Sequence, residues 1–257
     1  INTYTIVATT GAHGSISPAG TSTVSYGYNP VYTMTPITGY HVGNVVVDGA
    51  SVGAVTSYTF SSVSASHTIS VAYEVNHYNI VSTSGANGTI SPAGTTSVIF
   101  GTSQAYVMSP TTGYHVADVV VDGSSVGAVT SYTFSSVSAA HTISVSFAIN
   151  TFNIVASSGA HGGISPSGTT VVSYGGSQTY TITPDAGYLV SSVSVDGFGV
   201  GAVTTYTFSS VSSNHTISVS FIPNSNTIVA SSAAHGTISP TGSTIVSYGG
   251  SQTYSMT

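Results

Sequence analysis

One long block recurs in register along this chain, and this repeat restricts the fold more than any other feature. The stretch from Gly39 to Phe60 returns 74 residues later, and again 74 residues after that. In the first copy the apolar run 45–47 stops at an Asp-Gly pair, which readily adopts the positive φ angles of a tight reversal. Each copy therefore predicts a central strand that enters a hairpin turn. The predicted turn pairs are Asp48-Gly49, Asp122-Gly123 and Asp196-Gly197.

The register of the repeat predicts domain boundaries. Residues 36–75 and 110–149 are identical at 31 of 40 positions, with no insertion or deletion. The joins between copies are only about three residues long, which leaves neighbouring domains little freedom to swing. We expect three complete β domains and the first half of a fourth. Their predicted bounds are 1–75, 76–149, 150–223 and 224–257.

Composition selects strands over helices. The chain has no Lys or Arg, one Leu and one Glu, so most strong helix formers are nearly absent, while Ser and Thr make up about a third of the residues. Seven or so short strands per copy predict an all-β fold, a tandem array of small two-layer, β-sandwich-like domains. A β-grasp-like unit is the alternative, but it needs a helix across the sheet. The only candidate segment, 61–66, is too short and too rich in Ser.

The first copy illustrates the expected strands. We expect Tyr58 and Phe60 to come back against the apolar run 45–47, and Val63 to be the one buried residue of a later loop. The alternation of apolar and polar residues, with Gly and Pro as breaks, predicts the strand positions. These positions are 3–9, 15–17, 24–26, 31–35, 45–47, 58–60 and 67–75.

Charge excludes several classes of partner. Only 2% of the 257 residues are charged, and the formal net charge is −6 with no Lys or Arg. Nothing can neutralise phosphates, which excludes nucleic-acid binding through a basic surface. Anionic membranes are an equally poor partner, and no apolar run approaches the roughly 18 residues of a membrane span, so we expect no membrane insertion in this segment. There is no Cys, so disulfides play no part.

The order of short motifs resembles that of a known repeat family. The copies carry, in the same order, motifs of the type Tyr-Thr-Ile-Val-Ala, Gly-Ser-Ile-Ser-Pro-Ala-Gly, Gly-Tyr-His-Val, Val-Val-Asp-Gly, Ser-Tyr-Thr-Phe and His-Thr-Ile-Ser-Val. This arrangement is similar to the divergent internalin-type B repeat over the whole chain. The resemblance implies tandem arrays in large secreted or surface-attached bacterial and archaeal proteins, where the repeats act as stalks, spacers or adhesive modules. It implies no catalytic residue, and the complete absence of Lys and Arg departs from many relatives.

Metal and catalytic sites are not expected. Calcium takes six to eight oxygens, and each copy offers at most two acids, so the recurring Asp is interpreted as turn chemistry. On that interpretation Asp122→Asn is nearly silent, because Asn-Gly suits the same turn. His67 recurs as His141 and His215 without a neighbouring ligand motif, and we expect a hydrogen-bonded structural role at the start of the last strand. Near-identical copies offer no unique cleft for a nucleophile and base, so we expect no cofactor and no enzyme.

Tyrosines and sequons are the remaining candidate sites. Tyr40, Tyr114 and Tyr188 lie near turns, where their rings either stack on sugar faces or cover the ends of the small cores. Asn87 and Asn214 fit the N-glycosylation acceptor pattern, since each is followed by a Thr two positions later.

The sequence thus predicts a structural extracellular protein, a rod, stalk or self-associating fibre. The alternative is an adhesin or carbohydrate-binding module that binds glycans through the turn-proximal tyrosines. Because net charge is what normally keeps proteins apart, a chain with so little charge is expected to associate with itself, end to end or laterally. The incomplete fourth copy lacks its second half, so we expect the polypeptide to continue past Thr257 or another chain to complete the fold by strand addition.

Overall fold

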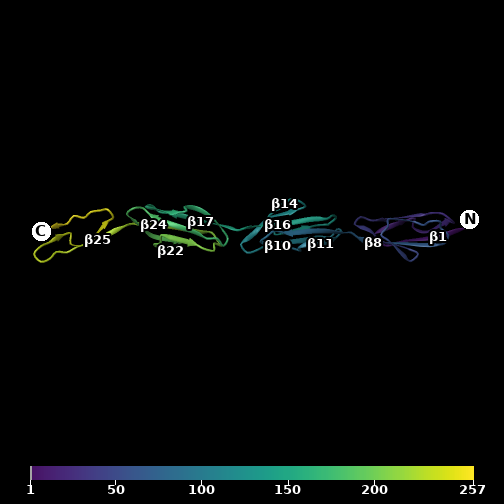
Figure 1. Cartoon of the computed structure of the whole chain (residues 1–257), viewed down its shortest axis with the longest axis horizontal. Helices are drawn as coiled ribbons and strands as arrows, with labels where there is room; N and C mark the ends of the chain where they lie inside the picture. Colours follow the sequence, from purple (N-terminus) through teal and green to yellow (C-terminus); the bar gives the residue numbers. More distant parts are fainter. Residues whose placement is uncertain (1) are drawn as a thin grey trace. The chain divides into compact units, whose positions relative to one another are not determined.

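The computed structural model describes residues 2–257, and within them every regular element is a β-strand (Figure 1). The strands form three similar sets of eight, followed by four strands in residues 224–257. The prediction of a tandem array of all-β domains is therefore confirmed. The β-grasp alternative is wrong, because the helix that it requires is absent from the described residues.

Repeat 1 consists of two sheets. The larger has five strands in the order β3-β1-β8-β5-β6, and the smaller has three in the order β2-β4-β7. The strands are β1 (Thr3–Thr10), β2 (Gly14–Ser17), β3 (Gly20–Ser25), β4 (Val31–Pro36), β5 (Tyr40–Val47), β6 (Ala50–Gly53), β7 (Ser57–Thr59) and β8 (His67–Val75).

Repeats 2 and 3 have the same strand order in both sheets. Repeat 2 consists of β9 (His77–Ser84), β10 (Gly88–Ser91), β11 (Gly94–Ile99), β12 (Gln104–Pro110), β13 (Tyr114–Val121), β14 (Ser124–Gly127), β15 (Ser131–Phe134) and β16 (His141–Ile149). Repeat 3 consists of β17 (Thr151–Ser158), β18 (Gly162–Ser165), β19 (Gly168–Ser173), β20 (Gln178–Pro184), β21 (Tyr188–Val195), β22 (Phe198–Gly201), β23 (Thr205–Phe208) and β24 (His215–Pro223).

The first and last strands of a repeat lie side by side and run in the same direction. In repeat 1 the parallel pairing of β1 with β8 extends from Ile6 opposite His67 to Thr10 opposite Val71. The strands that flank this pair, β3 and β5, are antiparallel to it. The chain therefore enters each repeat beside the strand by which it leaves.

A single core lies between the two sheets of each repeat. Strands that alternate apolar and polar residues place one apolar face of each sheet inward. In repeat 1, Ile6 and Val45 of the larger sheet belong to the same buried cluster as Tyr32 and Met34 of β4. Repeats 2 and 3 bury equivalent clusters. Burying each such side chain contributes roughly 1.5–3 kcal/mol.

A buried tyrosine occupies the middle of each core. Tyr32 is fully buried, and its ring meets that of Phe60 edge to face at a centroid distance of 5.8 Å. Tyr106 and Tyr180 occupy the same place in the next two repeats. None of these three hydroxyl groups has a hydrogen-bond partner within the described chain.

The segment expected to form the later strand of the central hairpin lies in the other sheet. Phe60 lies in the same buried cluster as Val45 and Val47, but Tyr58 and Phe60 are not on a strand that pairs with residues 45–47, because β7 pairs with β4 in the smaller sheet, with Tyr58 opposite Tyr32. Only β6 pairs with β5. Gly53, at a φ of 85°, ends β6 and lets the chain cross between layers, so Phe60 reaches the core from the opposite sheet. Val63 is buried in its loop, as predicted.

The chain divides into two compact units. One contains the chain up to Ser109 together with Val116–Phe147, and the other contains Pro110–His115 together with Ala148–Thr257. The turn before β13, although part of repeat 2, is thus grouped with repeat 3. The two are in contact, because the N–H of Asn150 donates to the carbonyl oxygen of Gly113.

Residues 224–257, here called the fourth segment, keep the strand pairing of a repeat without its buried core. β25 (Ser225–Ala230) pairs with β27 (Gly242–Ser247), and β26 (Ile238–Ser239) pairs with β28 (Ser255–Met256). Ile228 is 39% exposed, whereas Ile154 at the same position of repeat 3 is fully buried.

Candidate functional site

The three Asp-Gly pairs lie at the tips of the hairpins that follow β5, β13 and β21. Asp48 and Gly49 have φ angles of 49° and 83°, and the other two pairs have nearly the same angles. Two successive residues with positive φ make a two-residue turn of type I′, in which Asp and Gly are favoured. The structure places these residues where the sequence predicts a reversal.

Each of these aspartates also holds a histidine. His67 Nδ1 lies 2.6 Å from Asp48 Oδ2, and the N–H of Thr68 donates to Asp48 Oδ1 at 2.7 Å. In return, the N–H of Asp48 donates to the carbonyl oxygen of Thr68. The imidazole ring lies 4.8 Å from the ring of Phe60. The same Asp–His pair recurs as Asp122 with His141 and as Asp196 with His215, at 2.7 Å in both cases.

The hydrogen bonds lower the pKa of all three aspartates. At Asp48 and Asp122, partial desolvation raises the pKa, but the Thr N–H and the His ring outweigh it, so that the pKa falls below the usual value of 3.8. At Asp196 the hydrogen bond from His215 is the largest cause of the lowered pKa. A carboxylate whose pKa is lower in the folded than in the unfolded state stabilises the fold above the unfolded pKa. That stabilisation is lost as the pH falls through the folded pKa.

This pair corrects the interpretation of Asp122 as turn chemistry alone. Its two carboxylate oxygens accept hydrogen bonds from His141 and from the N–H of Thr142, which connect the hairpin tip to the start of β16. Asparagine suits the turn but offers only one oxygen, so Asp122→Asn loses an acceptor. Aspartate and histidine were each recognisable in the sequence; the missed signal is their constant separation of 19 residues.

Repeat 3 adds a hydroxyl to the pair. Ser213 Oγ lies 3.4 Å from His215 Nε2, on the side of the ring away from Asp196. A serine, a histidine and an aspartate in this order resemble a nucleophile, a base and an orienting acid. Repeats 1 and 2 carry Ala65 and Ala139 at the serine position. What the three pairs share is therefore the connection between the hairpin and the last strand, and not the serine.

The asparagine that opens each of the second, third and fourth copies joins it to the copy before. The N–H of Asn76 donates to the carbonyl oxygen of Gly39 at 2.8 Å, and its own carbonyl oxygen accepts the N–H of Phe100 at 2.9 Å. Its side-chain Oδ1 lies 2.9 Å from His41 Nδ1. Gly39, at a φ of 85°, has the ring of Phe100 where a side chain would otherwise stand.

The same join recurs twice. Asn150 makes the two backbone bonds with Gly113 and Tyr174, and its Oδ1 lies 2.8 Å from His115 Nδ1. Asn224 makes them with Gly187 and Tyr248, but Leu189 replaces the histidine there. The sequence shows the short joins but not this bridging role. The constant Asn at the start of each copy and the Gly before Tyr40, Tyr114 and Tyr188 are the signals that could have found it.

Two of the three candidate sugar-stacking tyrosines already stack on the chain itself. Tyr40 lies parallel to His13 at a centroid distance of 4.0 Å, and Tyr188 lies parallel to His161 at 4.1 Å. In repeat 2 the position of His13 is taken by Asn87. Tyr114 is thus the candidate whose ring lacks a histidine on its face among the described residues.

The two glycosylation motifs differ in the hydrogen bonds of their asparagines. Asn87 is exposed at the tip of the β9–β10 turn, with a φ of 69°. The side chain of Asn214 is occupied, because its Oδ1 accepts the N–H of Asn153 at 2.8 Å. The hydroxyl of Thr216, in the same motif, lies 3.5 Å from Asp196. Both asparagines are exposed, and they differ in that the side chain of Asn214 is held by this hydrogen bond.

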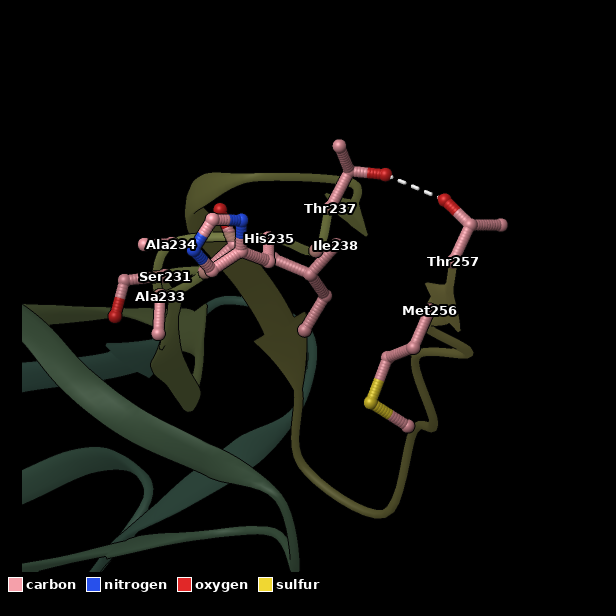
Figure 2. A pocket seen from close by; sticks show the side chains of 10 residues that line it. Ser231, Ala233, Ala234, His235, Thr237, Ile238, Met256 and Thr257 are labelled. Atoms are coloured by element: carbon pink, nitrogen blue, oxygen red, sulfur yellow. Dashed lines mark hydrogen bonds between the residues drawn. The ribbon is translucent and has the colours of Figure 1, made fainter.

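The fourth segment contains a hollow of about 450 Å³. Figure 2 shows His235, Ile238 and Met256 around it, with a hydrogen bond between the hydroxyl groups of Thr237 and Thr257. It lies beside Ala233. In complete repeats the residue at this position, for example Gly159, donates to the last strand at Val219 O. The hollow is thus the place that the last strand fills in a complete repeat.

Side chains that could together hold a metal ion are not grouped in the part of the chain that the structure describes. No three His, Asp or Glu side chains come together there as a candidate metal site. None of its elements is a helix long and apolar enough to cross a membrane.

Comparisons with known proteins assign no family to the chain. No family model matches it, and no curated protein matches it. Among solved structures it is similar to a chain described as "Central Fibronectin-III array of RIM-binding protein", with 12% identity and a TM-score of 0.15, over 77% of this chain and 84% of that one. At this TM-score the similarity carries no argument. The resemblance to the internalin-type B repeat stays a prediction.

Proposed function

We propose that the chain is a structural segment of an extracellular protein, in which tandem β domains act as a rod, stalk or fibre without enzymatic activity. The observation that carries the proposal is the combination of a separate core in every complete repeat with the same Asn bridge at each join. Separate cores let repeats be added without disturbing one another, and bridged joins hold each copy to the next. Both properties suit a spacer.

The histidine-aspartate pairs support a structural role over a catalytic one. The pair is present in all three repeats, whereas the serine beside it is present only in repeat 3. Nucleophilic catalysis of the Ser-His-Asp type needs the hydroxyl group, and repeats 1 and 2 have Ala65 and Ala139 in its place. The pair instead connects the hairpin tip to the last strand, which is a constraint on folding.

Small-angle X-ray scattering of the whole chain tests the spacer. A 74-residue domain is about 30 Å across, so end-to-end repeats predict a maximum dimension above about 100 Å. A globular particle of about 60 Å would contradict the proposal. Antibodies against the chain should label intact cells of the source organism, and labelling only after permeabilisation would refute the extracellular location.

Glycan binding is the second candidate, and the specific observation behind it is Tyr114. Its ring lacks the stacked histidine of Tyr40 and Tyr188, so a sugar would not have to displace an aromatic partner there. Binding of the chain to a glycan array that is abolished by Tyr114→Ala and kept by Tyr188→Ala would support this function. Binding that Tyr114→Ala leaves unchanged would exclude it.

A further inference from the structure

One asparagine of the chain, Asn87, is followed by a glycine. The other ten are followed by Thr, Pro, Val, His, Ile or Ser. Asparagine is thermolabile because the peptide nitrogen of the next residue can attack its side-chain carbonyl carbon. A side chain on that next residue hinders the attack, and glycine has none. Asn87 is therefore the asparagine whose neighbour hinders this reaction least.

The fold requires the glycine that follows Asn87. The ring of Phe147 stands where a Cβ at Gly88 would lie. The equivalent glycines of repeats 1 and 3 are also covered by an aromatic ring, but there the preceding residue is a histidine, His13 or His161. Among the three complete repeats, only repeat 2 thus combines the required glycine with an asparagine.

The side chain of Asn87 is exposed and is not held in place. It lies at the tip of the β9–β10 turn, and the residue has a φ of 69°. The side-chain oxygens of Asn29, Asn76 and Asn214 each make a hydrogen bond, whereas within the described residues no hydrogen bond holds the side chain of Asn87. No such bond has to break before the amide of Asn87 turns toward the peptide nitrogen of Gly88.

The three Asp-Gly pairs are open to the same ring closure, but the structure protects them. The carboxylate of Asp122 is bound by the His141 ring and by the N–H of Thr142, and these bonds lower its pKa and keep it ionised at neutral pH. A carboxylate repels a nucleophile and has no neutral leaving group, so it reacts far less readily than an amide. Asp48 and Asp196 are held in the same way.

We propose that Asn87 is a modification site, which the folded chain converts to aspartate and isoaspartate through a succinimide formed with Gly88. The nitrogen of Gly88 bonds to Cγ of Asn87, the bond from Cγ to Nδ2 breaks, and ammonia leaves with the proton that the Gly88 nitrogen gives up. Water then opens the ring at either carbonyl carbon. Each conversion adds one negative charge to a formal net charge of −6 and removes the acceptor nitrogen of the glycosylation motif at 87–89. The inference goes beyond the proposed spacer role and does not depend on it.

Peptide mapping by mass spectrometry of the whole chain, aged in its native state at 37 °C, tests the proposal. Asn87 should be the first asparagine converted, with isoaspartate as the larger product. The conversion should be faster at pH 8 than at pH 6, because the attacking nitrogen must lose its proton. Earlier conversion of another asparagine would overturn the proposal, and so would aspartate as the sole product, which indicates direct hydrolysis. Conversion of Asn87 in denatured chain but not in native chain would also overturn it, because the folded turn would then block ring closure.

Asn87→His is the matched control, since it installs the residue that repeats 1 and 3 carry at this position. The backbone there has φ angles of 74° at His13 and 72° at His161, close to that of Asn87, so the variant should keep the far-UV circular dichroism of the native chain. Isoelectric focusing of aged native chain should show a more acidic form that grows with time, and the variant should lack it. An acidic form that grows at the same rate in the variant would place the reaction at another residue and refute the proposal.

Discussion

Repeat 3 and the fourth segment start with nearly the same sequence, but their side chains are buried to very different extents. The pairing of β17 with β19 and that of β25 with β27 have the same register, 74 residues apart. Ile154 is fully buried in repeat 3, whereas its counterpart Ile228 is 39% exposed. Strand pairing is thus decided by the local sequence and its turns, while burial depends on the second half of the repeat, which supplies β21 to β24.

The difference predicts where a protease acts first, and this is the largest expected effect. Chymotrypsin should cut native chain after Tyr248, which is 62% exposed, about 100-fold faster than after Tyr174 of repeat 3, because only the complete repeat must open before cleavage. Mass spectrometry of a time course identifies the sites. Denatured chain, in which both tyrosines are accessible, is the control and should be cut at similar rates. Equal rates of cleavage after Tyr248 and Tyr174 in the native chain would mean that the fourth segment is as well protected as repeat 3.

Truncating the same isoleucine in repeat 3 and in the fourth segment should give unequal losses of stability. Ile154→Ala leaves a cavity in a complete core and should lower the local free energy of unfolding by about 2–5 kcal/mol. Ile228→Ala, at a partly exposed site, should lower it by less than about 1 kcal/mol. Hydrogen exchange of the amides of β17 and β25 measures both. A loss at Ile228 as large as at Ile154 would mean that the fourth segment has a core of its own.

Acid should lower the stability of the complete repeats and not that of the fourth segment. The pKa of Asp122 is lower in the folded than in the unfolded state, so its ionised carboxylate stabilises repeat 2 above about pH 4, where the unfolded carboxyl ionises. That stabilisation is lost as the pH falls below this range. Asp122→Asn should cost about 0.5–1.5 kcal/mol at pH 6 and flatten the dependence of repeat 2 on pH below 4. Hydrogen exchange at pH 6 and pH 3 provides the readout. The fourth segment contains no acid and serves as the internal control; a silent Asp122→Asn would restore the simple turn interpretation.

The smallest effect concerns the buried hydroxyls. Tyr180→Phe removes an unpaired polar group from a complete core and should raise the stability of repeat 3 by up to about 1 kcal/mol. Tyr254→Phe in the fourth segment, where the hydroxyl is also unpaired, should change little because no complete core surrounds it. Thermal unfolding of the two variants compares them directly. A destabilising Tyr180→Phe would indicate a partner for the hydroxyl, such as a bound water.

Sequence alone predicted most of the fold and less of the candidate site. The alternation of apolar and polar residues that predicted the strands at 3–9 and 67–75 is local, and so are the positive φ angles at Asp48-Gly49, so short stretches of sequence are enough to predict both. The pairing of β7 with β4 was missed, because apolar alternation at Tyr58 does not say which layer receives the strand. The Asp48–His67 pair and the Asn76 bridge join residues far apart in the chain. Only a fold that places the hairpin tip beside the last strand brings them together.

The parallel pairing of β1 with β8 has a mechanical consequence. Because the two strands point the same way, a pull on the ends of repeat 1 draws Ile6 and His67 in opposite directions along the strands. The load then falls on all the hydrogen bonds between the strands at once, as shear, instead of opening them one after another from an end. A tether made of such units would lengthen in abrupt steps, one per repeat. Each repeat would keep its length until all the hydrogen bonds between its first and last strands break together.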